Sequence, residues 1–169
     1  MIKRLRKLFY FLLIFTGASL VANAWITRDH VTGAAPPLPL DQRIHYRNDA
    51  DRPTTGSAQN APTLVYFYAS WCPICKVDLP AVESLAGSYP VVAVAMQSGN
   101  DAEVLAHRIE QDFDLDIIND ETGELSRAFG VRGVPTAFVV EDDSNIRFST
   151  QGFSGWIGYW SRMLLADWF

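Results

Sequence analysis

Cysteine is scarce in this chain, whose 169 residues include two, Cys72 and Cys75, with two residues between them. A disulfide framework that staples a small fold uses several pairs and longer loops, because closing so short a loop removes little entropy from the unfolded chain. With nearly half of its residues apolar, the chain is also long enough to bury one core without staples. We therefore expect the pair to carry chemistry rather than to hold the fold together.

Basic residues are also scarce beyond position 28. Five of the fourteen Lys and Arg residues lie in residues 1–28, which contain no Asp or Glu, so the rest of the chain holds nine basic and nineteen acidic residues. Proteins that bind nucleic acids need a basic face that displaces counterions from the phosphates. The acidic balance of residues 29–169 therefore argues against a nucleic-acid partner.

Charge is missing altogether from residues 8–26, which follow a basic flank at residues 1–7. As a helix this run would span about 28 Å, close to the hydrocarbon thickness of a bilayer. The flank predicts that residues 1–7 stay in the cytoplasm, so residues 8–26 are predicted to be a single-pass anchor with the rest of the chain outside the cytoplasm. The sequence Ala22-Asn23-Ala24 leaves a cleaved signal peptide open, although the length of the run favours the anchor.

Proline, glycine and small polar residues dominate residues 27–59, which we interpret as a linker and N-terminal extension with a short strand within residues 38–46. Residues 60–169 are predicted to form one domain. The patterns predict strands at residues 63–69, 91–96, 115–118, 136–141 and 146–151, and helices at residues 73–88, 101–112, 122–129 and 154–167. This alternation predicts an α/β domain with a mainly parallel central sheet, helices on both faces and an antiparallel hairpin at one edge.

Two of these helices have an expected buried side. One side of the helix at residues 101–112 is expected to be formed by Val104, Leu105, Arg108 and Ile109. The last helix is expected to carry Trp156, Tyr159, Trp160, Met163 and Leu164 inward. The histidines His30, His45 and His107 are scattered along the chain, and we expect them at the surface.

The cysteine pair follows the first predicted strand and opens the first predicted helix. Pro73 suits the first helical turn, where a missing N–H is tolerated. At a helix N-terminus, free backbone N–H groups and the helix dipole lower the pKa of a thiol, so Cys72 is predicted to be the attacking thiolate. Cys75 lies one turn later, and we expect it to be more buried and to resolve the mixed disulfide.

Two short segments resemble the signatures of thioredoxins. Residues 68–76, YASWCPICK, resemble the Trp-Cys-x-x-Cys-Lys signature, and residues 130–136, GVRGVPT, resemble the second signature, in which a cis-proline faces the cysteines. The full pattern resembles membrane-anchored thioredoxin-like proteins of the periplasm, most closely the suppressor-of-copper-sensitivity D group, which is related to the cytochrome-c-maturation thioredoxins. The resemblance covers roughly residues 60–169 and implies a thioredoxin-like fold with a central mixed sheet.

The resemblance also implies roles for residues around the cysteines. Pro135 would carry a cis peptide bond after Val134 and present the Val134 backbone to an extended partner peptide beside Cys72. Trp71 would form the apolar rim of that surface, with simple core packing as the alternative.

One departure from thioredoxins concerns a buried carboxylate. Thioredoxins have an Asp in the first strand, where this chain has Tyr66. The cytochrome-maturation relatives place a carboxylate three residues after the second cysteine, so Asp78 is the candidate that tunes the ionisation of Cys75. The alternative for Asp78 is a solvated helix residue.

These features together predict a protein-disulfide oxidoreductase of the bacterial inner membrane, with its domain in the periplasm. Ile74 of the Pro73-Ile74 dipeptide cannot stabilise a thiolate through its side chain as a histidine can, so we expect a reductant or relay rather than a strong oxidant. Its partners would be periplasmic protein thiols and disulfides. The resemblance implies that a membrane thiol reductase supplies its electrons, because the periplasm is kept oxidising. We expect no cofactor and no metal ligands, and the resemblance implies a link to copper tolerance.

Two other functions remain open. A membrane-tethered Cu(I) or zinc module could use the two thiolates; zinc prefers four ligands, which the scattered histidines do not offer, whereas Cu(I) could use two thiolates alone. The second possible function is a structural adaptor that kept the fold and lost its activity. The presence of both cysteines argues against this function.

Overall fold

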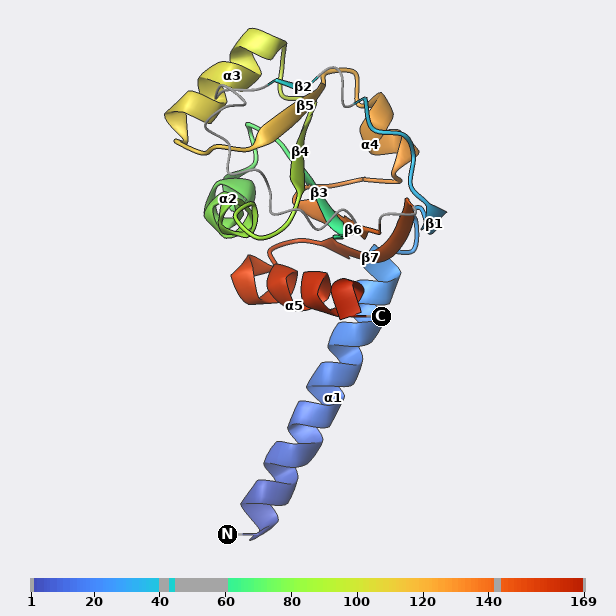
Figure 1. Ribbon diagram of the computed structural model, residues 1–169. Helices are drawn as coiled ribbons and strands as arrows, with labels where there is room; N and C mark the ends of the chain where they lie inside the picture. Colours follow the sequence, from blue (N-terminus) through green and yellow to red (C-terminus); the bar gives the residue numbers. More distant parts are fainter. Residues whose placement is uncertain (1, 40–42, 45–60, 142–143, 169) are drawn as a thin grey trace.

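The structure, a computed structural model, describes residues 2–39, 43–44, 61–141 and 144–168. A long helix, α1 (Ile2–Ile26), projects from an α/β domain (Figure 1). The elements of the domain are β1 (Gly33–Ala34), β2 (Arg43–Ile44), β3 (Thr63–Tyr68), α2 (Pro73–Leu85), β4 (Val91–Met96), α3 (Asp101–Glu110), β5 (Asp116–Asp120), α4 (Glu124–Ala128), β6 (Thr136–Val140), β7 (Asn145–Gln151) and α5 (Gly155–Trp168).

The described strands form a seven-stranded sheet in the order β1-β7-β6-β3-β4-β5-β2. Strand β4 runs parallel to β3 and to β5, whereas β6 pairs antiparallel with both β3 and β7. The expectation of a mainly parallel sheet is therefore wrong, because β6 enters the sheet from the loop after α4 in the direction opposite to β3. The central mixed sheet that the resemblance implied is confirmed.

Strand β3 is buried on both faces of the sheet, which is why its sequence reads as one apolar run. Leu64, Tyr66 and Tyr68 point into a core shared with α2 and α5. Val65 and Phe67 point into a second core, which the chain around Leu38 and Phe129 helps to cover. The first core lies directly behind the start of α2, so it supports the cysteine pair.

The buried side of α5 differs from the expected one. Tyr159 and Met163 are buried as expected, but Trp156 and Trp160 are 48% and 40% exposed. Their rings stack on each other with centroids 5.6 Å apart. The expectation failed because aromatic content does not identify which side of a helix faces the core.

Helix α3 shows a similar difference. Val104 and Arg108 are buried, but Ile109 is 58% exposed and His107 is buried instead. The rings of Tyr68 and Phe113 lie 6.0 and 6.2 Å from that of His107. Burial, and then the charge of Lys76, lowers the pKa of His107.

His30 is buried as well, against the ring of Phe138, and burial lowers its pKa. The expectation of surface histidines is therefore wrong for His30 and His107, because aromatic side chains cover both imidazoles. His45 lies outside the described residues.

The chain that follows α1 is bound to the domain. The backbone N–H of Val31 donates to the Phe129 carbonyl oxygen at 3.2 Å, and Arg132 pairs with Asp29 at 3.1 Å. Strands β1 and β7 pair antiparallel. Part of the predicted extension therefore packs on the sheet, and β2 lies within the predicted strand at residues 38–46, of which residues 40–42 and 45–46 are outside the described part.

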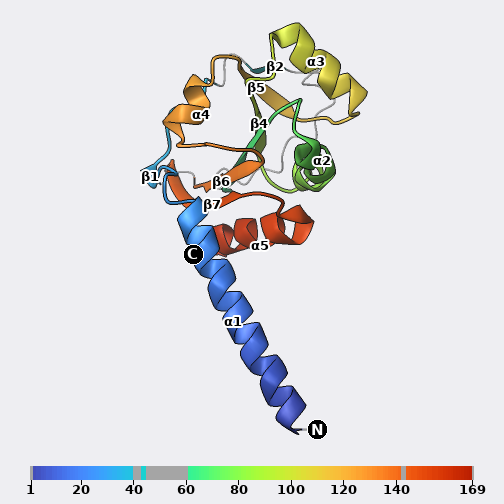
Figure 2. The ribbon, with the colours of Figure 1, turned by 180° about the vertical axis from the view of Figure 1, so that it is seen from behind.

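Seen from behind, α1 again projects from the end of the domain that carries α5 (Figure 2). Within the part of the chain that the structure describes, no helix combines the length and the apolar character that crossing a membrane requires. The anchor at residues 8–26 stays a prediction.

Candidate active site

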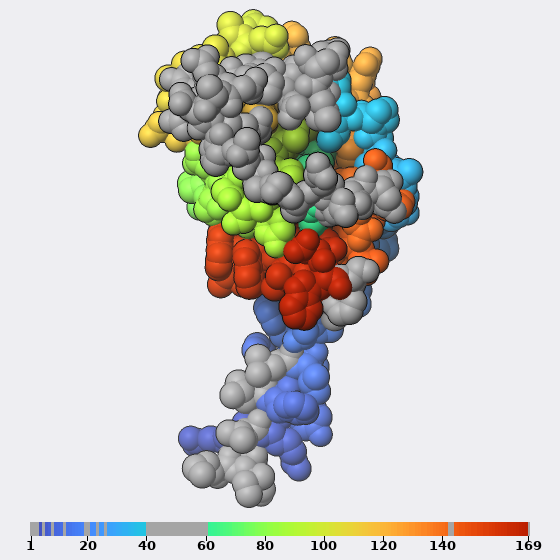
Figure 3. Space-filling view, in the orientation of Figure 1, coloured from blue at the N-terminus to red at the C-terminus, as the bar shows by residue number. Residues whose placement is uncertain are grey.

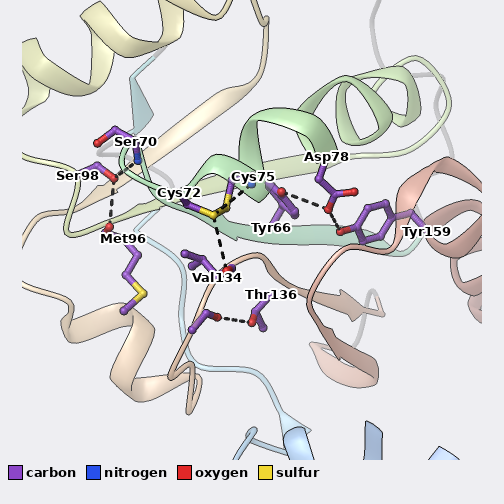
Figure 4. Close-up of a disulfide and its surroundings, with 11 residues drawn as sticks. Tyr66, Ser70, Cys72, Cys75, Asp78, Met96, Ser98, Val134, Thr136 and Tyr159 are labelled. Atoms are coloured by element: carbon purple, nitrogen blue, oxygen red, sulfur yellow. Dashed lines mark hydrogen bonds between the residues drawn. A yellow bond between two sulfur atoms is a disulfide. The ribbon is translucent and has the colours of Figure 1, made fainter. Parts of the chain in front are cut away.

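Cys72 caps the N-terminus of α2 with its own sulfur (Figure 4). Its backbone is extended, with φ −93° and ψ 108°, and its Sγ accepts from the backbone N–H of Cys75 at 3.2 Å. Pro73 occupies the first helical turn, where its missing N–H costs nothing. A sulfur in this position receives the electrostatic stabilisation that a helix N-terminus offers to an anion.

The two cysteines are joined in a disulfide, with their Cα atoms 5.3 Å apart. Cys72 is 5% exposed, whereas Cys75 is fully buried. An incoming sulfur can therefore reach Cys72 more readily than Cys75. This agrees with the expected division between an attacking and a resolving cysteine.

The loop before β6 brings a backbone carbonyl to the disulfide. The Val134–Pro135 peptide bond is cis, as the resemblance implied, and the Val134 carbonyl oxygen lies 3.7 Å from Cys72 Sγ. Thr136 Oγ1 donates to the Gly133 carbonyl oxygen at 2.7 Å and so ties this loop to the start of β6. Residues 62 positions apart in the sequence thus meet at one sulfur.

Two apolar side chains beside Cys72 are open to solvent. Trp71 is 61% exposed and Ile74 is 53% exposed, so the alternative of core packing for Trp71 is wrong. The indole N–H of Trp71 donates to the Gln97 carbonyl oxygen at 3.1 Å, which holds the ring at the rim.

The end of β4 also supports the loop that carries the cysteines. The backbone N–H of Ser70 donates to Ser98 Oγ at 3.0 Å, and Ser98 donates in turn to the Met96 carbonyl oxygen. Sequence reasoning missed Gln97 and Ser98, because no local pattern marks residues that contact a loop nearly thirty positions away.

Asp78 is fully buried, so its alternative as a solvated helix residue is wrong. Its carboxylate accepts hydrogen bonds from the Tyr159 hydroxyl at 2.5 Å, the Gly155 backbone N–H at 3.1 Å and the Tyr66 hydroxyl at 3.4 Å. A buried carboxylate is tolerated when it is hydrogen-bonded in this way. Tyr66, which occupies the position of the thioredoxin Asp, therefore contacts the carboxylate supplied by α2.

The two tyrosines are held in the protonated form. Burial, followed by the proximity of Tyr159 and Asp78, raises the pKa of Tyr66. Burial, followed by the charge of Asp78, raises the pKa of Tyr159. Both hydroxyls therefore remain hydrogen-bond donors to Asp78.

The site offers few ligands for a metal ion. Within the described part of the chain, no three His, Cys, Asp or Glu side chains gather as ligands. A two-coordinate Cu(I) ion needs the two thiolates alone, so the carrier hypothesis stays a prediction.

The model of the AhpC/TSA family matches residues 34–149. This match runs from the second residue of β1 into β7 and includes the cysteine pair and the cis-proline. The chain belongs to the AhpC/TSA family. The match begins within the segment interpreted as an extension, in agreement with the pairing of β1 and β7.

Relatives of this AhpC/TSA-family chain are named as thioredoxin-like or thiol:disulfide interchange proteins. It is 35% identical over 112 residues to a thioredoxin-like protein of Haemophilus influenzae, covering 66% of each chain. It is 31% identical over 96 residues to the thiol:disulfide interchange protein DsbE of Pseudomonas fluorescens, covering 56% of this chain and 53% of that protein. The aligned part thus spans about half to two thirds of these relatives. The predicted enzyme class, a thioredoxin-like thiol–disulfide oxidoreductase, is confirmed, whereas the narrower copper-sensitivity group stays a prediction.

A solved structure supports the fold. The solution structure of a thioredoxin-like protein in its oxidised form matches with a TM-score of 0.62 at 22% identity, over 80% of this chain and 95% of that one. At this identity the likeness shows the fold alone, and it confirms the predicted thioredoxin-like α/β architecture.

The buried tyrosines lead to a pH prediction. Burial raises the pKa of Tyr66, Tyr68 and Tyr159 in the folded protein, whereas an unfolded tyrosine ionises near pH 10. The free energy of unfolding is therefore expected to fall as the pH rises through about 10, because only the unfolded state releases these protons.

Ultraviolet titration of tyrosinate should show an early phase and a late phase that coincides with unfolding followed by circular dichroism. Tyr159→Phe should reduce the late phase and leave the early one unchanged. A single phase near pH 10 with the fold intact would contradict this assignment.

Proposed function

We propose that this protein is a membrane-anchored reductase or relay that passes electrons to disulfides of periplasmic proteins. The observation that carries the proposal is the placement of Cys72 Sγ at the start of α2 beside the Val134 carbonyl, with Cys75 fully buried. Trp71 and Ile74 offer apolar contact around the sulfur, and the Val134 backbone offers hydrogen bonds to an extended peptide.

The proposed reaction begins with both cysteines reduced. The Cys72 thiolate attacks one sulfur of the partner disulfide, so a mixed disulfide forms and the other partner sulfur leaves as a thiolate. The Cys75 thiolate then attacks Cys72 Sγ, forms the Cys72–Cys75 disulfide and releases the second partner sulfur. Two electrons have passed to the partner, and its two thiolates take protons from water.

The proposed direction of electron flow is supported by the dipeptide between the cysteines. Ile74 is more than half exposed and has no hydrogen-bond donor in its side chain, so it adds nothing to the stabilisation that Cys72 Sγ receives from the backbone N–H of Cys75. Less stabilisation of the thiolate makes the dithiol form less favoured and the protein a weaker oxidant. In an oxidising compartment, a membrane thiol reductase must then regenerate the dithiol.

Asp78 is the proposed proton acceptor for Cys75. It lies three residues after Cys75 on α2, and both side chains are fully buried. A buried thiol needs a base to become a thiolate, and Asp78 is held in place by Tyr66 and Tyr159.

The proposed membrane anchor and periplasmic location are supported by the N-terminal segment of the chain. Helix α1 continues unbroken through the uncharged run at residues 8–26. Large apolar side chains along it are exposed, including Phe9, Phe11, Ile14 and Phe15. Exposed apolar groups on a helix of this length, after a basic flank, favour insertion into the inner membrane with the domain in the periplasm.

Trapping tests the proposed function. In the native host, Cys75→Ala should leave partner proteins covalently attached to Cys72, because the resolving thiol is gone. The complexes should disappear on reduction and should be absent in the matched Cys72→Ala/Cys75→Ala variant. Recovery of no mixed disulfide, with the domain folded and exported, would reject the proposal.

Replacement of the carboxylate tests the role of Asp78. Asp78→Asn should slow the decay of a mixed disulfide with glutathione on the order of 10²-fold at pH 7, because a positioned base is lost. The rate should recover as the pH rises, while alkylation of Cys72 stays unchanged. Glu83→Gln, on the same helix, is the matched control.

Tyr159→Phe keeps the carboxylate and should slow the decay less than Asp78→Asn does. Decay at the wild-type rate in a folded Asp78→Asn protein would refute the role of Asp78.

A further inference from the structure

Helix α5 and the turn before it expose an unusual number of large apolar side chains. The exposed residues are Phe153, Trp156, Ile157, Trp160, Leu165 and Trp168, and we call them the α5 aromatic face. None of them takes part in the disulfide site. Such a surface usually marks contact with a partner or a membrane.

The α5 aromatic face is directed away from the rest of the domain. The opposite side of α5 buries Tyr159, Met163 and Ala166 in the core shared with α2. Residues 156, 157, 160 and 168 are spaced so that they fall on one side of a helix. Helix α5 therefore carries apolar side chains on two sides, one packed in the core and one, rich in aromatic rings, open to solvent.

This face lies at the end of the domain from which α1 projects. In the space-filling view, α5 forms the lower end of the domain, and α1 continues below it (Figure 3). Figure 1 shows α5 running across the upper end of α1 rather than along it. The contacts of Val31 with Phe129 and of Asp29 with Arg132 tie the chain that follows α1 to the domain.

The junction between α1 and the domain has the chemistry of a membrane interface. Trp25 is 67% exposed near the end of α1, and the Arg28 guanidinium lies 4.0 Å from the centre of its ring. Tryptophan rings gather at the headgroup level of bilayers, where an apolar ring with one N–H donor is well solvated.

We propose that the α5 aromatic face lies on the outer surface of the bilayer that α1 crosses. Trp156, Trp160 and Trp168 would then sit at the depth of the lipid headgroups, as in helices that lie in the interface plane. The proposal rests on the proposed anchor. It adds that the domain is held against the membrane in one orientation instead of hanging from a free tether.

Tryptophan fluorescence tests this contact in the full chain. The chain has five tryptophans, so three variants isolate three reporters. The double variant Trp25→Phe/Trp71→Phe keeps the three tryptophans of α5. In each of the two other variants, four tryptophans are replaced by Phe, which leaves Trp25 alone in one and Trp71 alone in the other. Each is reconstituted into vesicles of phosphatidylethanolamine and phosphatidylglycerol whose acyl chains are brominated near the headgroup end.

We expect the α5 tryptophans and Trp25 to lose most of their emission relative to unbrominated vesicles, and Trp71 to lose almost none. Quenching of Trp25 without quenching of α5 overturns the contact and leaves the anchor. Quenching of the α5 tryptophans without quenching of Trp25 supports the contact of α5 with the membrane and overturns the anchor. Quenching of neither overturns both.

A second variant separates the membrane from a second copy of the chain as the occupant. Ile157 is 73% exposed, so Ile157→Asp leaves the core intact, and near-ultraviolet circular dichroism of the buried tyrosines reports folding. If the membrane is the occupant, Ile157→Asp should reduce the quenching of the α5 tryptophans severalfold, while Trp25 stays quenched. The opposite result would be a dimer, seen by sedimentation in detergent, that Ile157→Asp dissociates, together with α5 tryptophans that are not quenched. The occupant of the α5 aromatic face would then be a second copy of the chain instead of the membrane.

Discussion

The hydrogen bond from the Cys75 backbone N–H to Cys72 Sγ is the interaction on which the site depends. It makes a reactive sulfur the cap of α2, so the group that satisfies the helix end is also the group that reacts. Capping by an oxygen would also stabilise the helix, but it would supply no thiolate for disulfide exchange. The local fold and the chemistry are therefore one arrangement at Cys72.

This arrangement requires α2 to stay fixed on the sheet. Asp78 joins three elements, because it receives hydrogen bonds from Tyr66 on β3 and from Gly155 and Tyr159 of α5. The Val134 loop meets the sulfur from another direction. The site thus has a rigid support behind Cys75 and an accessible side at Trp71 and Ile74, which suits the proposed brief contact with an extended partner chain.

Much of this was predictable from sequence, because the decisive residues are local. Cys72, Pro73 and Cys75 lie in one turn of helix, and Pro135 lies in a short loop with its own signature. The pairing of Asp78 with Tyr159 was not predictable, since 81 positions separate them and neither residue type is specific to such a contact. The orientation of Trp156 and Trp160 was predicted wrongly, because their apolar character suggests burial whichever side of α5 they occupy.

The histidines illustrate the same limit. His30 and His107 are polar by type, yet aromatic neighbours bury them, and those neighbours come from other elements. Sequence reasoning therefore succeeds where the chemistry is carried by adjacent residues. It fails where a side chain's environment is assembled from distant ones.

The reactivity of Cys72 in the reduced full chain tests the central claim most directly. The rate of alkylation by iodoacetamide is measured against pH, and peptide mapping identifies the sulfur that has reacted. Capping of α2 predicts that Cys72 reacts first, with a midpoint below the ordinary thiol pKa of about 8.5, while Cys75 stays unmodified in the folded protein. Equal modification of both sulfurs, or a Cys72 midpoint at or above the ordinary value, would contradict the account.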